Sequence, residues 1–155
     1  MEGARGIYMG SPSQQDIVSY ILAGVAGGLL MGSVFMAVGP VMIFVLAKNP
    51  SAAFETILNR ISPRVVMIGT VIIGYPFWVL VGAGIGLLCW ASTGTWTDQG
   101  LGSSNLLFTT VIVMVGVAIA SPLIFILKRV FLGTTLLTIV FIVIFGWVVP
   151  FLATN

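Results

Sequence analysis

Charged residues in this chain are so few that their positions divide it into four long uncharged stretches. The sequence holds six basic residues, four acidic residues and no histidine. Residues 17–47, 65–97, 99–127 and 130–155 carry no charge at all. An α-helix needs about 20 apolar residues to cross the roughly 30 Å of hydrocarbon in a bilayer. Each stretch is therefore long enough for one crossing, and none is long enough for two crossings with a turn between them.

Composition supports the same conclusion. Hydrophobic residues make up 59% of the chain and charged residues 6%, whereas about a quarter of an ordinary soluble domain is charged. Helices that are apolar on every face leave no surface for water, which excludes a soluble four-helix bundle. We therefore predict an all-α protein, an integral membrane bundle of four helices that run alternately up and down.

Turn-forming residues give working limits for the spans. We predict a short tail over 1–16 and a transmembrane domain over 17–155, with spans at 17–47, 65–90, 106–127 and 134–152. Gly133 followed by Thr134 indicates a turn glycine and an N-cap, which places the start of the fourth helix at Thr134. The Gly39–Pro40 pair predicts that the first helix kinks or that its end turns onto the membrane surface. Pro76, deep in the second span, predicts a kink there.

The connection between the first two spans has the pattern of a short amphipathic helix over residues 50–61. Asn49 and Pro50 form a typical helix start, and Ser62–Pro63 form a typical stop. Apolar residues recur between them at helical spacing, with polar residues on the opposite side. These apolar residues are Phe54, Ile57, Leu58 and Ile61. We predict an interfacial helix with this face toward the lipid, the alternative being a polar loop with incidental apolar residues.

Basic residues predict the orientation of the chain, because Lys and Arg near helix ends are retained on the cytoplasmic side. Five of the six lie in the connections 48–64 and 128–133. We therefore expect both connections in the cytoplasm, both termini outside, and the chain in the plasma or inner membrane. Aromatic residues that favour the headgroup region also fall at the predicted outer boundary, namely Tyr20, Trp90, Trp96 and Trp147.

Glycines recur at four-residue intervals in the first span. Gly24, Gly28 and Gly32 lie along one stripe of the helix, and Gly82 and Gly86 repeat the spacing in the second span. In a membrane, such stripes let two backbones approach closely. We predict a helix-packing seam at these five positions. The spacing leaves open whether the seam joins helices of one chain or faces another subunit.

The chemistry that the predicted spans lack bears on function. Proton relays and cation-coupled carriers depend on an ionisable group in the membrane, and the predicted spans contain none. Cys89 is the only cysteine, so no metal-binding cluster is expected, and without histidine it lacks the base that would make it a nucleophile. The chain has no phosphate-binding loop and too few basic residues to bind nucleic acid. We predict a non-enzymatic protein without cofactor, metal, nucleotide or nucleic acid, whose partners are the lipid bilayer and other membrane subunits.

Two functions remain. The first is a small accessory, scaffold or assembly subunit of a larger membrane complex, which associates through the glycine seam and the surface helix. The second is a small oligomeric pore or carrier that uses backbone carbonyls and hydroxyls instead of charges. The hydroxyls available for this are those of Ser33, Thr109, Thr110, Thr134, Thr135 and Thr138. The abundance of packing features favours the first function.

Overall fold

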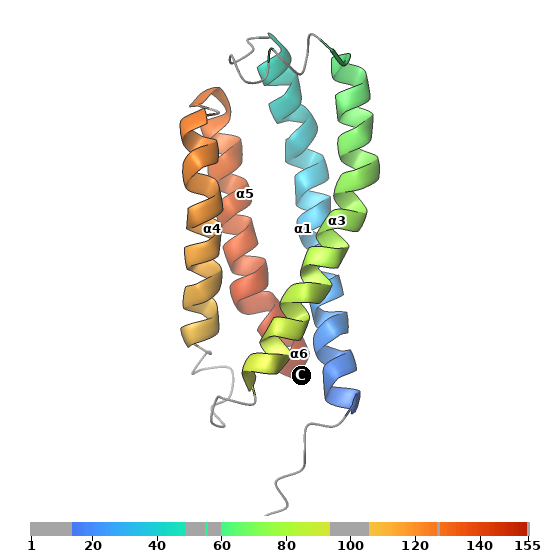
Figure 1. Cartoon of the computed structure of the whole chain (residues 1–155), viewed down its shortest axis with the longest axis vertical. Coiled ribbons are helices and arrows are strands. Elements are labelled where there is room, and N and C mark those ends of the chain that lie inside the picture. Colours follow the sequence, from blue (N-terminus) through green and yellow to red (C-terminus); the bar gives the residue numbers. More distant parts are fainter. Residues whose placement is uncertain (1–13, 49–54, 56–59, 94–105, 127, 155) are drawn as a thin grey trace, which may run out of the picture.

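The computed structural model of the chain describes residues 14–48, 55, 60–93, 106–126 and 128–154. Within these ranges the regular structure is entirely helical. Four helices are long and apolar enough to cross a membrane. In Figure 1 they run along the long axis of the molecule, and the chain direction alternates from each to the next.

The first two spans extend further than the sequence predicts. Helix α1 covers Gln14–Lys48 and helix α3 covers Pro63–Thr93. Helix α1 continues through Pro40 to Lys48 as one helix, so the structure shows no separate surface segment after Gly39–Pro40 in the described residues. The other alternative, a kink at this pair, stays a prediction. Helix α3 begins at Pro63, since the Ser62 side chain accepts the N–H of Val65 (3.4 Å) and proline suits the first helical position.

The second half contains α4 (Leu106–Ile126) and one continuous last span built from four consecutive segments. These segments are a 3₁₀ turn, η2 (Lys128–Val130), helix α5 (Phe131–Val143), a π-helical segment, η3 (Ile144–Val148), and helix α6 (Val149–Thr154).

The prediction that the fourth helix starts at Thr134 is therefore wrong. Gly133 lies inside α5, and no glycine that the structure describes has a positive φ. The Thr134 hydroxyl donates a hydrogen bond to the Val130 carbonyl (3.2 Å), so it bonds back along the helix instead of capping it. A glycine followed by a threonine inside a membrane helix thus resembles a helix start in sequence alone.

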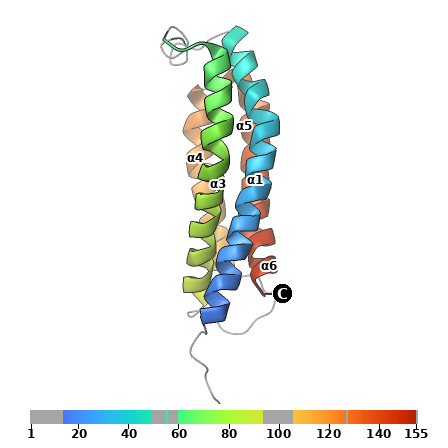
Figure 2. The same ribbon diagram turned by 90° about the vertical axis from the view of Figure 1, so that its right-hand side faces the viewer.

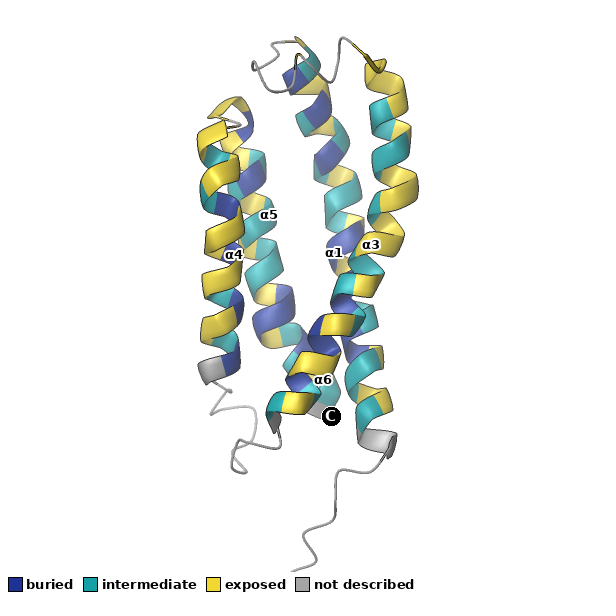
Figure 3. Ribbon diagram, in the orientation of Figure 1, coloured by how far each residue is buried: buried dark blue, intermediate teal, exposed yellow. Residues whose placement is uncertain are grey.

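The four spans are packed unevenly. Helices α1 and α3 lie side by side in both views, and α4 lies against the last span (Figures 1 and 2). The main core is near the end where α1 and α4 begin, whereas much of the surface of α3 is exposed (Figure 3). All four spans contribute to this core, through Ala23, Met31, Ile85, Cys89, Phe108, Ile112, Ile144, Phe145 and Val149.

Candidate helix-packing site

The seam glycines bring the backbone of α1 directly against the backbone of α3. A Cβ atom built on Gly24 would meet the Gly82 carbonyl oxygen and lie 2.9 Å from the Cα of Gly86. A Cβ atom built on Gly82 would meet the Gly24 carbonyl oxygen and lie 2.8 Å from the Cα of Gly28. The obstacles on both sides are main-chain atoms, which cannot rotate away. Only glycine therefore fits at this crossing without separating the helices.

The close approach continues on either side of this crossing. A Cβ atom on Gly28 would meet the Trp78 carbonyl oxygen and lie 3.0 Å from the Cα of Val79. A Cβ atom on Gly86 would meet the Tyr20 carbonyl oxygen. The matching four-residue spacing on two antiparallel helices thus produces one continuous contact. Such contact matters in a membrane, where helices associate through van der Waals packing without a hydrophobic driving force.

The fifth predicted position, Gly32, lies beyond the tightest part of the seam. Its Cβ atom would be 3.6 Å from the Tyr75 ring and from the Cβ of Trp78, which is ordinary van der Waals contact. Gly84, between the two seam glycines of α3, would place a Cβ atom with nothing within 4 Å. Position on the helix face, rather than glycine content, therefore decides which residues form the seam.

The seam lies inside the chain, which settles the question that the spacing left open. The backbone of α1 packs against the glycines of α3, and the backbone of α3 packs against the glycines of α1. Contact with another subunit through these glycines would require the two helices to separate. While α1 and α3 stay paired, these glycines are therefore not accessible to another subunit.

The structure describes only some of the other predicted site residues. Phe54, Ile57 and Leu58 lie outside the described residues, and Ile61 is exposed just before α3 begins. The interfacial helix accordingly stays a prediction. Pro76 lies near the middle of α3, and the ribbon of that helix bends along its length in Figure 1.

An aromatic cluster around Trp78 connects the two halves of the molecule, and the sequence analysis gave it no role. The Trp78 ring lies 5.9 Å from that of Phe35 on α1 and 6.2 Å from that of Phe141 on α5. Phe141 continues the cluster to Phe145 at 4.9 Å. These tilted arrangements are typical of favourable aromatic pairs. The sequence feature that could have indicated this role is the position of Trp78 in the middle of an apolar span. Tryptophan usually prefers the boundary of the membrane.

A hydrogen bond between α4 and the last span also escaped the sequence analysis. The Thr109 hydroxyl donates to the Gly146 carbonyl at 3.1 Å. Pro150, four residues further on, has no N–H, so this carbonyl lacks its usual helical donor. In the same segment the Val149 N–H donates to the Ile144 carbonyl, five residues back, as in a π-helix. Thr109 thus supplies the bond that the proline removes.

Several other hydroxyls described in the spans bond to their own helix. Ser33 donates to the Leu29 carbonyl (2.9 Å), and Thr138 donates to the Thr134 carbonyl (2.8 Å). The Thr70 and Ser121 hydroxyls follow the same pattern. Such bonds occupy the hydroxyl proton within the helix.

Side chains that could bind a metal ion or act as a nucleophile are few in the described part of the chain. There, no group of three or more His, Cys, Asp or Glu residues is placed to hold a metal ion. Cys89 is only 2% exposed and belongs to the main core. Its thiol is therefore shielded by packing rather than presented to a reactant.

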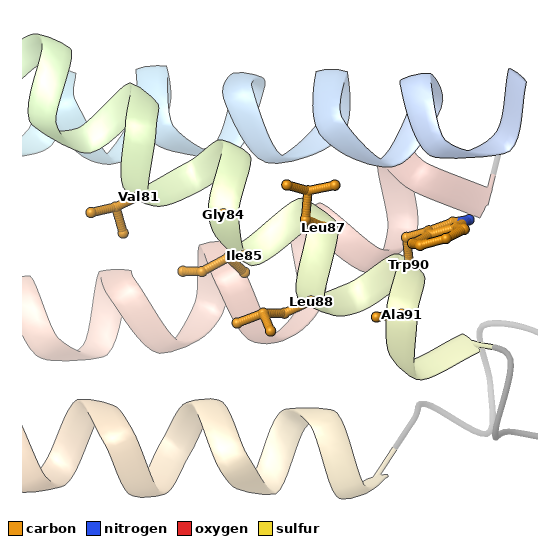
Figure 4. A pocket seen from close by; sticks show the side chains of 7 residues that line it. All are labelled: Val81, Gly84, Ile85, Leu87, Leu88, Trp90 and Ala91. Carbon is orange, nitrogen blue, oxygen red and sulfur yellow. The ribbon is translucent and has the colours of Figure 1, made fainter. Parts of the chain in front are cut away.

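An apolar groove of about 610 Å³ opens beside the second half of α3. Figure 4 shows that all of its lining side chains come from α3. The lining residues are Val81, Gly84, Ile85, Leu87, Leu88, Trp90 and Ala91. None of them is charged, so the groove offers no acid, base or ion ligand.

A scan against protein-family models found no match, and searches of curated proteins and of solved structures found none either. The structure itself supports a class: its four long apolar helices are those of a multi-pass membrane protein.

Proposed function

We propose that this chain is a small, non-catalytic subunit of a larger membrane complex, with an accessory, scaffold or assembly role. The observation that carries the proposal is that hydroxyl groups in the spans form hydrogen bonds within the chain. Described hydroxyls in all four spans donate to backbone carbonyls of the chain itself. Groups used in this way stabilise helices and the joints between them.

The alternative function, a small oligomeric pore or carrier, has less support. It relies on six hydroxyls, of which those of Ser33, Thr109, Thr134 and Thr138 already donate within the chain. Of the other two, Thr110 and Thr135, the Thr135 hydroxyl oxygen is buried without a hydrogen-bond partner. Within the described spans, residues 17–47, 65–93, 106–126 and 130–154 also include no charged residue. A conducting path would have to be lined mainly by apolar side chains.

The internal position of the glycine seam changes where contact with other membrane subunits is expected. The outer surfaces of the spans remain for this role, and α3 is the least buried of the four. Ile72, Ile73 and Leu80 on α3 are each about two-thirds exposed or more, at 66%, 71% and 72%. We therefore expect a partner subunit to bind to this surface of α3.

Purification from native membranes in mild detergent tests the proposal. A photo-crosslinking residue at Leu80 should form an adduct with a second, different membrane protein. The matched control carries the same residue at Met114, a 68% exposed position on α4. A stable hetero-complex supports a subunit role. A self-contained oligomer with ion flux in liposomes would favour the pore, and a monomer without partners would contradict both functions.

We propose that the chain resides in the plasma or inner membrane with its connections 48–64 and 128–133 in the cytoplasm and both termini outside. The location of five basic residues in these connections supports this orientation. In a Cys89→Ala background, which loses only a buried thiol, Ser51→Cys should react with membrane-impermeant maleimide from the inside and Ser103→Cys from the outside. Labelling of Ser51→Cys from the outside would overturn the orientation.

A further inference from the structure

Five basic residues from separate parts of the sequence lie at the same end of the helices, where α1 ends, α3 begins and η2 lies, which is the top of Figure 1. They are Lys48, Arg60, Arg64, Lys128 and Arg129, and all five are exposed. We call this set the basic end. Glu55 is the one acidic residue that the structure describes there. The basic end therefore carries a large local excess of positive charge.

Packing holds the two parts of the basic end together. The turn η2, which carries Lys128 and Arg129, contacts α1. Val130, the next residue, is only 5% exposed. One helical turn further, a Cβ atom on Gly133 would lie 2.8 Å from the Met42 sulfur. Close packing of α5 on α1 thus fixes the charges of η2 beside the helix that ends at Lys48.

The positions of these side chains suit the boundary between hydrocarbon and headgroups. Each basic residue lies at or just beyond the end of an apolar span. The Lys48 ammonium lies 4.5 Å from the centre of the Phe44 ring, one turn back along α1, so this side chain lies along the apolar surface near the helix end. Basic groups between membrane helices at this depth are typical sites for acidic lipid headgroups.

We propose that the basic end binds the phosphate headgroups of anionic phospholipids in the leaflet that it faces. An acidic segment of a protein would have the same charge. The depth of the five side chains favours lipid, because headgroup phosphates are always present at that level. The site would fix lipid around the connections of the bundle and is independent of any partner on α3.

Lipid titration of the purified full-length chain tests this inference. In a non-ionic detergent, phosphatidylglycerol should raise the thermal unfolding temperature and be retained in native mass spectra. Phosphatidylcholine with the same acyl chains should have little effect. The preference should weaken as NaCl increases, because about 0.1 M salt already reduces the screening length to about 10 Å. Equal binding of the two lipids would overturn the proposal.

Two triple variants locate the site. Lys48→Gln, Lys128→Gln and Arg129→Gln together should lower phosphatidylglycerol affinity on the order of a hundredfold. The charge-preserving triple Lys48→Arg, Lys128→Arg and Arg129→Lys should stay close to wild type. A neutral variant that keeps the lipid preference, or that loses a co-purifying acidic protein instead, would contradict the proposal. The wild-type lipid comparison remains decisive even if the neutral variant inserts poorly.

Discussion

The two helix pairs of this molecule are joined by different means. Helices α1 and α3 meet backbone to backbone through glycines, whereas α4 and the last span meet through side chains and the hydrogen bond from Thr109 to Gly146. The first contact requires a residue type at a fixed spacing on each helix. The second requires that a hydroxyl on one helix reach a carbonyl that a proline has freed on another. Only the first requirement is visible as a pattern in the sequence.

Leucine in the tightly packed part of the α1–α3 seam, next to the Gly24–Gly82 crossing, should give the largest loss. Gly28→Leu and Gly86→Leu both direct a side chain into backbone atoms, so we expect each to lower the free energy of unfolding by about 3 kcal/mol. Unfolding of the purified variants in detergent measures this loss. The control is Gly84→Leu on the same helix, where the new side chain enters open space. If Gly86→Leu is as stable as Gly84→Leu, the backbones are not in close contact.

Alanine at two nearby glycines compares contact with backbone and contact with side chain on a single helix. Gly24→Ala meets main-chain atoms of α3, whereas Gly27→Ala meets the Cγ2 methyl of Val149, which can move. We expect costs of about 2 kcal/mol and about 1 kcal/mol, within the range for overpacking. Combining Gly27→Ala with Val149→Ala should remove the clash. A Gly27→Ala penalty that is unchanged in the Val149→Ala background would show that the backbone limits this contact too.

Removal of the Thr109 hydroxyl tests the joint between α4 and the last span. Thr109→Val should cost about 0.6 to 1.7 kcal/mol, the range for hydrogen bonds between membrane helices. Thr109→Ser keeps the donor and should be nearly neutral. The matched control is Thr138→Val, since that hydroxyl bonds within its own helix. Equal unfolding curves for Thr109→Val and Thr138→Val would mean that the interhelical bond adds nothing.

The smallest effect is expected at the edge of the seam. Gly32→Ala places a methyl group in ordinary contact with Tyr75 and Trp78, so stability should change by less than about 0.5 kcal/mol. The same detergent unfolding measurement applies. A loss as large as that of Gly24→Ala would extend the tight seam to Gly32.

The number and approximate positions of the apolar helices could be predicted, because charged residues are excluded from long apolar segments. The ends were harder to predict, since each depends on local bonding. Ser62 and Pro63, which the sequence pattern predicts as the end of the interfacial helix, also begin α3, and the pattern did not indicate that second role. Gly133 and Thr134 were interpreted as a helix start, although close packing against Met42 on α1 accounts for the glycine.

The seam residues could be named from the sequence, but not their partner. Spacing specifies which face of a helix is flat and gives no information about what lies opposite. The roles of Trp78 and Thr109 could not be predicted for a related reason. Their contacts with Phe141 and Gly146 join residues far apart in the chain. Pro150 indicates that the Gly146 carbonyl lacks a donor, but several hydroxyls in the sequence are candidates to replace it.

The position of the seam in the chain has a consequence for biosynthesis. The residues that form it are complete by Gly86, before any of α4 has been synthesised. Since domains synthesised first generally fold first, we expect the first hairpin to assemble in the membrane while the ribosome is still translating the second half. Gly27, which receives Val149, would then be part of a preformed surface on which the last helix docks.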